Sequence, residues 1–254
     1  MATFVPDELI YESDLSKKNF RKFTAVMAMI SMAQFVSLYK RYISGENGGS
    51  YALFSLLNRY IEIIIEEVYL THGDVLKFFR TSIDFQRYWE NKSFQKSSLH
   101  VDDALLVMWK VNRDEFVSKM VHHAILSAQR IQNAVAHVKN EDFVSKVNIV
   151  ISTGSLTFSI IGDDRARHFV IAGKPIEDLK HAKRISLPGD LILSSSAWEH
   201  CSPSQYEYVI KDARNVKIIK VVGPPTEPSR KSNAPVDNLS LNGHPSLTRT
   251  LSEM

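Results

Sequence analysis

Few residues in this 254-residue chain have side chain types and a spacing that could support chemistry. The adjacent His122 and His123 fall within a helical pattern, where neighbouring side chains project in different directions and make poor joint metal ligands. The glycine-rich residues 45–49 precede a helix but lack the Lys-Ser/Thr pair of a phosphate-binding loop. Cys201 has no obvious base beside it, so we expect a half-buried thiol after a short helix rather than a nucleophile.

The carboxylate pair Asp102 and Asp103 is more informative, because it lies between two short apolar runs. These runs are residues 71–79 and 101–109, and each is typical of a buried strand next to a tight turn. Residues 80–100 separate them and are rich in Ser, Lys, Arg and aromatic residues without a clean period. Without residues 80–100, the two runs form one β-hairpin whose turn carries both carboxylates.

The rest of the chain mixes helical and strand patterns. Apolar spacing predicts helices over residues 31–43, 51–70, 176–185 and, after Asn112, one long helix. We expect strands at residues 23–30 (with helix as the alternative), 168–172, 190–193, 206–210 and 216–221, and a second hairpin of residues 147–152 and 156–161 about Gly154. This mixture, without strict βαβ alternation, favours an α+β fold with helices packed on a largely antiparallel sheet.

Local signals predict how two of the helices begin or end. Gly73 suits the left-handed cap of the helix over residues 51–70. Asn112 and Glu115 have the spacing of a capping box at the start of the long helix. One face of that helix is expected to carry Phe116, Met120, Val121, Ala124, Ile125, Ala128, Ile131 and Val135.

Composition bounds the class of protein. With 44% hydrophobic and 23% charged residues the chain is ordinary globular material with one core, and a net charge of +3 gives no reason to expect nucleic acid as a partner. A single cysteine excludes an internal disulfide framework and fits a reducing compartment. Since no apolar run approaches the roughly 20 residues of a membrane span, we expect a soluble, cytoplasmic protein. Residues 1–20 form a polar lead-in, and residues 226–254, rich in Pro, Ser, Asn and Thr, a disordered tail.

The joined hairpin resembles that of the class III nucleotidyl cyclases, most closely the first catalytic domain of the soluble, bicarbonate-responsive adenylyl cyclases. The likeness continues, in the same order, through residues 160–163, 168–173, 176–179 and 190–194. It implies a cyclase-type domain with a largely antiparallel, ferredoxin-like sheet over residues 21–225. Residues 80–100 are then an insertion in the hairpin, or alternatively a retained exon segment.

The resemblance implies conversion of ATP to cyclic AMP and pyrophosphate with Mg²⁺ or Mn²⁺ held by two carboxylates. Asp103, with Asp102 as the alternative, matches one of these ligands. Met29 takes the place of the other, and a thioether cannot replace a carboxylate for Mg²⁺. Met32 replaces a glycine that allows the backbone close to phosphate. We therefore expect at most one weak metal site.

The resemblance also assigns nucleotide-binding positions. Lys77 matches a lysine that recognises adenine in the family; the alternative is a strand-end lysine that points to solvent. The same alignment assigns Ile30 and Ser31 to nucleotide binding.

The helix over residues 176–185 departs from the family. Glu177 and His181 stand where the partner face of the family offers an Asn and an Arg that stabilises phosphate charge. Lys180 takes the place of an arginine associated with bicarbonate, and it can neutralise an anion without offering a planar fork.

These departures lead to three hypotheses for function. The first is a cyclase-like domain that keeps nucleotide-binding and dimerising surfaces, as a homodimer or with another cyclase domain, but has lost or severely weakened catalysis. The second is an active half that contributes Asp103 or Lys77 to a site shared with a complete cyclase domain. The third is a non-enzymatic protein-interaction module.

Overall fold

The computed structural model describes residues 20–33, 35–44, 49–79, 104–112, 116–140, 143–144, 146–162 and 167–223. The predictions for the lead-in, for residues 80–100, for Asp102 and Asp103 and for the tail therefore lie outside the described residues.

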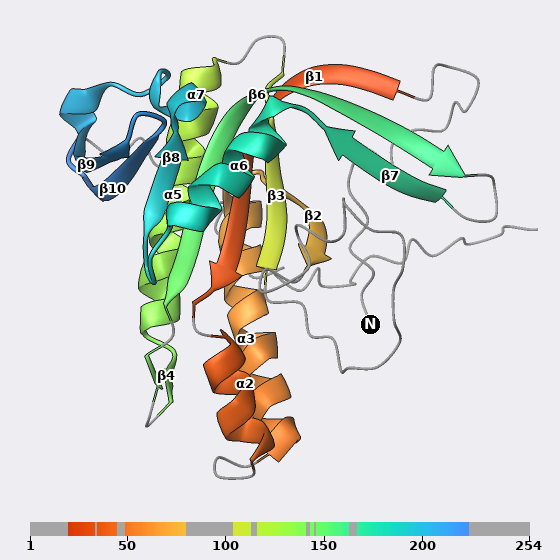
Figure 1. The fold of residues 1–254 in the computed structure, drawn as a ribbon, viewed down its shortest axis with the longest axis vertical. Coiled ribbons are helices and arrows are strands. Elements are labelled where there is room, and N and C mark those ends of the chain that lie inside the picture. The colour runs from red at the N-terminus through yellow and green to blue at the C-terminus, as the bar shows by residue number, and fades with distance from the viewer. Residues whose placement is uncertain are drawn as a thin grey trace, which may run out of the picture.

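A mixed sheet organises the described part of the chain (Figure 1). Its eight described strands have the order β2-β3-β1-β6-β8-β10-β9, and β7 pairs with β6 outside this path. Its described pairings are antiparallel apart from the parallel pairing of β6 with β8. These strands are β1 (Phe20–Met32), β2 (Asp74–Phe79), β3 (Ala104–Lys110), β6 (Val147–Gly162), β7 (Arg167–Ala172), β8 (Leu191–Ser194), β9 (Tyr206–Asp212) and β10 (Asn215–Val221); the short β4 (Lys139–Asn140) and β5 (Phe143–Val144) pair separately.

Helices cover both faces of the sheet. Figure 1 shows the two long helices on one face and α6 on the other. The helices are α2 (Phe35–Ile43), α3 (Gly49–Leu70), α5 (Val117–Ala136), α6 (Lys174–Ile185) and α7 (Ser195–Trp198), with a 3₁₀ turn at Pro203–Gln205. This is the predicted α+β architecture, with a largely antiparallel sheet.

Two apolar clusters, one on each face of the sheet, form the core. Side chains along a strand alternate between faces, so β1 supplies both clusters. Its even-numbered residues from Val26 to Met32 join the larger cluster with α3 and α5. Ala25, Met27 and Met29 join the smaller cluster, which α6 covers. The residues from Ala25 to Ala33 are at most 5% exposed, so β1 is the buried centre of the domain.

The predicted hairpin across residues 80–100 is confirmed. β2 and β3 pair antiparallel from Asp74 opposite Met108 to Phe79 opposite Ala104. The predicted second hairpin is wrong, because residues 147–162 form the single strand β6, which pairs with β1 from Val147 to Ser159. Gly154 lies within β6 opposite Ala25, and a Cβ there would meet Pro175 of α6 at 3.2 Å. This glycine thus allows close approach of a helix and marks no turn.

The predicted capping box is also wrong. The long helix α5 begins at Val117, with Phe116 at the capping position, so Asn112 lies too early to cap it. Phe116 is 77% exposed and does not belong to the buried face predicted for it. The other seven residues predicted for that face are buried, together with Ser127.

The end of α3 differs from the prediction by one residue. His72, with φ of 60°, adopts the left-handed conformation, and the Gly73 N–H donates to the Val68 carbonyl at 2.9 Å. This is a Schellman arrangement with His72 where glycine is usual. Gly73 is needed for space, because a Cβ there would lie 2.8 Å from Trp109 and from Val68. Trp109 also donates its indole N–H to Thr71 at 3.1 Å, which ties β3 to the helix end.

We expect Gly73→Ala to lower the free energy of unfolding by about 1–3 kcal/mol, because the added methyl group overpacks the Trp109 contact. His72→Gly is the matched control and should stay within about 1 kcal/mol of the unchanged protein, since it relieves a left-handed side chain. Urea unfolding measures both; equal losses for the two variants would contradict this account.

A polar pair joins α5 to the C-terminal hairpin. The His122 Nδ1 and Tyr206 hydroxyl atoms are 2.6 Å apart. Burial lowers the pKa of His122 and raises the pKa of Tyr206.

Burial also raises the pKa of the half-buried Cys201 to about 12, so this thiol stays protonated at neutral pH, as expected for a structural cysteine.

The lowered pKa of His122 predicts a pH dependence of stability. As the pH falls, His122 of the unfolded chain becomes protonated near its ordinary pKa of about 6.5, whereas His122 of the folded chain becomes protonated only at a lower pH. The free energy of unfolding should therefore fall as the pH drops below about 6.5. Urea unfolding from about pH 8 to about pH 5 should show a shallower fall for His122→Gln than for the exposed control His200→Gln; parallel curves would exclude His122 as the cause.

Candidate functional site

The site positions assigned on β1 lie at the C-terminal end of this strand, and two of them, Met29 and Ser31, face α6. The strand register defines the neighbours of these residues across the sheet. Ser31 lies opposite Ala104 of β3 and Asn148 of β6, and Met29 lies opposite Leu106 of β3 and Val150 of β6. Ala104 directly follows Asp103, which lies outside the described residues. The predictions for Asp102 and Asp103 stay predictions.

Met29 is packed among apolar side chains. It is 2% exposed and belongs to the smaller cluster with Met27, Leu76, Met108 and Val150. None of these four side chains offers the oxygen ligands that Mg²⁺ requires. Within the described part of the chain, no group of three or more His, Cys, Asp or Glu side chains could hold a metal ion.

Ile30, Ser31 and Met32 differ in the direction of their side chains. Ile30 and Met32 are buried in the larger cluster, on the face away from α6. The Ser31 hydroxyl is fully buried and accepts a hydrogen bond of 2.5 Å from the Lys183 ammonium of α6. Of these three side chains, Ser31 is the one that accepts a hydrogen bond from a charged group of α6.

A β-bulge brings Lys77 to the same face of the sheet. The register of β2 shifts between Val75 and Lys77, so Lys77 lies opposite Leu106, which in turn lies opposite Met29. Regular alternation would have turned Lys77 into the larger core. Bulges re-aim side chains in this way, and here the bulge leaves Leu76 buried in the smaller cluster and Lys77 exposed. Lys77 and Met29 therefore stand two strands apart, about 10 Å.

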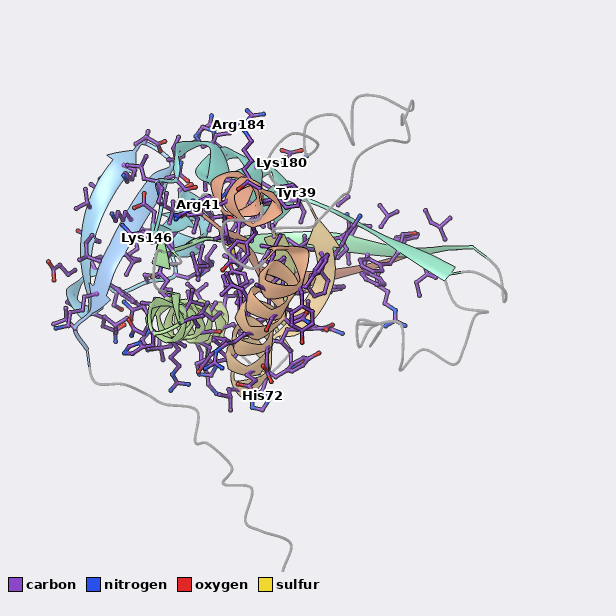
Figure 2. All side chains as sticks on the ribbon, turned by 90° about the horizontal axis from the view of Figure 1, so that it is seen from below. Tyr39, Arg41, His72, Lys146, Lys180 and Arg184 are labelled. Carbon is purple, nitrogen blue, oxygen red and sulfur yellow. The ribbon has the colours of Figure 1, made fainter. Side chains whose placement is uncertain are left out.

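The predicted positions on α6 have separate surroundings. Glu177 is exposed in the first turn, and His181 Nε2 lies 3.6 Å from Asp212 Oδ2 of β9. Figure 2 shows Lys180 and Arg184 on the face of the sheet opposite α3 and α5. Glu177 carries a carboxylate and His181 an imidazole. Neither therefore provides the Asn amide or the Arg guanidinium group that the family has at these positions according to the resemblance.

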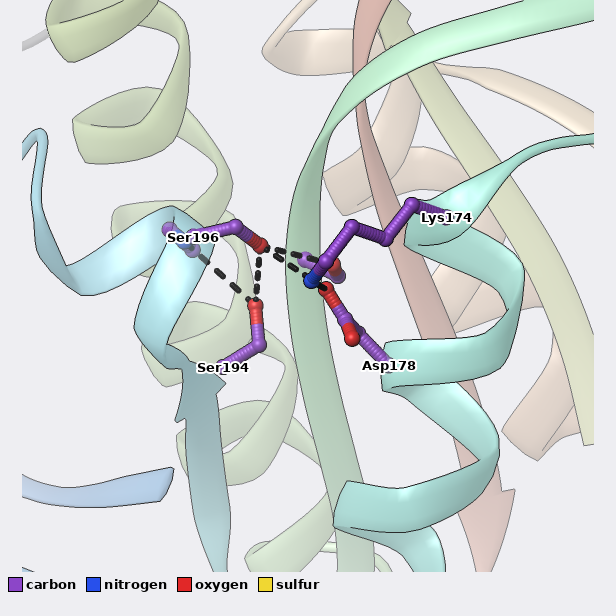
Figure 3. Close-up of polar contacts among 6 residues, drawn as sticks. Lys174, Asp178, Ser194 and Ser196 are labelled. Carbon is purple, nitrogen blue, oxygen red and sulfur yellow. Dashed lines mark hydrogen bonds and ion pairs between the residues drawn. The ribbon is translucent and has the colours of Figure 1, made fainter. Parts of the chain in front are cut away.

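Polar contacts fix α6 against the sheet. Asp178 accepts hydrogen bonds from Lys174 at 2.6 Å and from Ser196 at 3.2 Å, and Ser196 lies 2.8 Å from Ser194 (Figure 3). Ser152 of β6, fully buried, lies 3.2 Å from the same Ser196 hydroxyl. This network joins α6 to β6, β8 and α7, and so sets the position from which Lys183 reaches β1.

Sequence comparison finds adenylate cyclases. The chain is 25% identical to adenylate cyclase type 10 of Rattus norvegicus over 239 aligned residues and 26% identical to that of Mus musculus over 232. Each alignment covers 89% of this chain, and the chain spans about 13% of the length of these curated relatives. No family model matches the chain.

Solved structures with the same arrangement of elements are nucleotidyl cyclases. A bacterial light-regulated adenylyl cyclase superposes with a TM-score of 0.62 at 14% identity, over 85% of this chain and 58% of that chain. The adenylyl cyclase CyaB from P. aeruginosa gives 0.57 at 14% identity, over 83% and 99% of the two chains. The catalytic core of a rhodopsin-guanylyl cyclase in complex with ATPalphaS gives 0.57 at 12% identity, over 80% and 98%.

The fold is that of a class III nucleotidyl cyclase catalytic domain. The predicted resemblance is thereby confirmed, with adenylate cyclases as sequence relatives. For the two-metal chemistry of a cyclase, the described residues at the end of β1 do not fit: a buried thioether and a lysine ammonium stand there. No helix among the described residues is long and apolar enough to span a membrane.

Lys183 is the residue that sequence reasoning missed at this site. It lies 152 positions from Ser31, and neither pattern nor spacing links the two. The only sequence signal was the excess of basic residues on α6, which carries Lys174, Lys180, Lys183 and Arg184 against Glu177 and Asp178.

A buried ion pair holds the strand that follows α6. The Asp190 carboxylate is 2% exposed and lies 2.7 Å from the Lys217 ammonium and 3.4 Å from the Lys211 ammonium. It also accepts a hydrogen bond from the Leu187 N–H at 3.0 Å. Burial alone would raise the pKa of Asp190, but the contacts with Lys217, Leu187 and Lys211 lower it. The carboxylate is therefore ionised at neutral pH and joins the start of β8 to β9 and β10.

We expect Asp190→Ala to lower the free energy of unfolding by about 3 kcal/mol, because it leaves two half-buried lysines without their partner. The double variant Asp190→Ala/Lys217→Met should lose less than Asp190→Ala alone, since removing both partners also removes an uncompensated charge. Chemical denaturation of the two variants decides this, and a larger loss in the double variant would contradict it.

Proposed function

We propose that this chain is a nucleotide-binding, adenylyl-cyclase-like domain with its own catalysis lost or severely weakened, acting as a regulatory or pairing half. The observation that carries the proposal is Met29. It aligns with a metal-binding carboxylate of the family and lies buried in an apolar cluster. Two-metal catalysis clamps the attacking and leaving oxygens together, so loss of one ligand removes much of that clamp.

The position of Lys77 supports nucleotide binding. Its side chain is exposed on the α6 face, opposite Leu106 and in line with Met29 across the sheet. In the family the matching lysine recognises adenine. An exposed ammonium at this place can bind a nucleobase acceptor without help from a metal ion.

Exposed apolar side chains support pairing with a second domain. The start of β1, the end of β6 and β7 project beyond the helices in Figure 1. Phe20, Ile161 and Val170 on these strands are 54%, 55% and 38% exposed. Exposed apolar residues that lie together are typical of protein interfaces. The proposed partner is a second copy or another cyclase domain.

The proposed metal is Mg²⁺ or Mn²⁺ at one weak site that includes Asp103, with Asp102 as the alternative. Ser31 lies opposite Ala104, the residue after Asp103, and its hydroxyl already accepts a hydrogen bond from Lys183. We propose that a single carboxylate cannot support turnover in the isolated chain.

Cyclic AMP production is the test of lost catalysis. With Mg²⁺ or Mn²⁺, the purified chain should produce no more cyclic AMP than its Asp103→Ala variant. Steady production by the chain alone, abolished by Asp103→Ala, would contradict the proposal. Production that arises only after mixing with a complete cyclase domain, and that depends on Asp103 or Lys77, would instead establish an active half.

ATP binding is the test of the retained nucleotide site. Calorimetric titration should detect ATP, and Lys77→Ala should weaken its affinity by about tenfold through loss of a charge-assisted hydrogen bond. The exposed Lys220→Ala on β10 is the charge-matched control and should bind as the unchanged chain does. Absence of both turnover and nucleotide binding would leave only the protein-interaction module.

A further inference from the structure

The strand β9 leaves one edge of the described sheet open. β9 pairs with β10 on one side, and within the described part of the chain no strand pairs with its other side. Such an edge presents a row of backbone N–H and C=O groups without strand partners. Figure 1 shows β9 at the side of the molecule away from the projecting ends of β1, β6 and β7. The open edge is therefore separate from the surface proposed above for pairing with a cyclase domain.

The middle of this edge is apolar and exposed. Tyr208, Val209 and Ile210 are 38%, 51% and 69% exposed. Their register with β10 is regular, and the register shifts of this pair of strands lie on either side of them. Edge strands are commonly protected from pairing by a central lysine, a proline or a bulge. The centre of β9 has none of these protections.

Charged residues stand at both ends of this apolar centre. Lys211 and Lys217 both contact Asp190. Lys217 of β10 lies opposite Val209, so Val209 and Lys211 face the same side of the sheet. Side chains alternate along a strand, so Glu207 faces that side as well. Glu207 and Lys211 lie about 13 Å apart along the strand, which is too far for an ion pair within one chain.

These positions are self-complementary. A second β9 that runs antiparallel along the open edge, with a two-fold axis at Val209, brings Glu207 of each copy opposite Lys211 of the other. It also brings Tyr208 of each copy opposite Ile210 of the other, on the opposite face. Cross-strand pairs of opposite charge, and pairs of an aromatic with a β-branched residue, stabilise a sheet.

The neighbouring registers lose this complementarity. Residues directly opposite each other in an antiparallel pair share a face, so the two-fold axis falls on a residue. An axis at Tyr208 puts Glu207 opposite Val209, and an axis at Ile210 puts Lys211 opposite Val209. Both registers place a charge against an apolar side chain. The axis at Val209 is the one that pairs the charges.

We propose that two copies of this chain pair through β9, antiparallel and centred on Val209, so that the two sheets become continuous. The interface is isologous, with the same residues from each copy. Lys220 of β10 lies opposite Glu207, so each Glu207 lies between a lysine of its own chain and Lys211 of the other copy. Since one strand from each copy makes the contact, the dissociation constant is on the order of 10 µM.

Sedimentation equilibrium of the full chain at about 1–200 µM tests this pairing. Glu207→Lys places like charges opposite each other and should raise the dissociation constant by about tenfold or more. The double variant Glu207→Lys/Lys211→Glu reverses both charges and should return the constant to within about threefold of the unchanged chain. The charge-matched control is Glu66→Lys, which should pair as the unchanged chain does because Glu66 is exposed on α3. Equal weakening by Glu207→Lys and Glu66→Lys indicates a general charge effect and overturns the inference.

Amide hydrogen exchange is a second measurement, and it needs no variant. In the unchanged chain, the amides of residues 208–210 on the open edge should exchange about fivefold more slowly at about 200 µM than at about 1 µM. Exchange of these amides that is independent of concentration would overturn the inference.

The remaining outcomes identify other occupants of the edge. A dimer that is insensitive to Glu207→Lys but weakened by Ile161→Lys pairs through the end of β6; this overturns the inference and leaves the proposed function in place. A chain that stays monomeric while the open edge of β9 exchanges slowly has this edge covered by another of its own segments, which also overturns the inference. ATP binding does not involve β9, so Glu207→Lys should bind ATP as the unchanged chain does. Loss of ATP binding in the unchanged chain would contradict the proposed function alone.

Discussion

The burial of β1 on both faces is the constraint on which the rest of the structure depends. This strand pairs with β3 on one side and β6 on the other, while α3 and α5 cover one face and α6 the other. Every side chain on its second half must therefore be apolar or have a polar partner, because an unsatisfied buried charge is costly. Met29 meets this requirement by packing, and Ser31 by accepting a hydrogen bond from Lys183.

The same constraint links fold and function. A metal-binding carboxylate at Met29 would be stable only with cations beside it, since burial of a lone carboxylate disfavours its charged form. With methionine there, the α6 face of β1 packs with apolar side chains, and the Lys183 ammonium of α6 donates to Ser31 beside it. The network of Asp178, Ser196 and Ser194 holds α6 in place, so this charge has a fixed position relative to the sheet. The packing around Met29 thus keeps the cyclase fold without a carboxylate at this position.

Much of the fold follows from the sequence, but contacts between distant elements do not. Periodicity was enough for α3 and for the buried face of α5, and apolar runs were enough for β2 and β3 despite the 24 residues between them. The prediction of a turn at Gly154 was wrong because a glycine inside a strand gives the same sequence signal as a turn. Its role in leaving space for α6 is visible only in the packed structure. The space at Gly73 depends on Trp109, more than thirty residues away. Lys77 is assigned to nucleotide binding through the family resemblance, and this stays a prediction, whereas the contact of Lys183 with Ser31 arises through tertiary packing.

The central claim is that methionine at position 29 leaves the end of β1 with at most one weak site for a divalent cation. Paramagnetic Mn²⁺ tests it most directly, because Mn²⁺ broadens the NMR signals of nearby groups. In the nucleotide-free chain at an equimolar concentration of Mn²⁺, the methyl signal of Met29 should stay as sharp as that of Met120, which lies on the other face of the sheet. Selective broadening of the Met29 signal at this concentration would show a tight metal site and contradict the account.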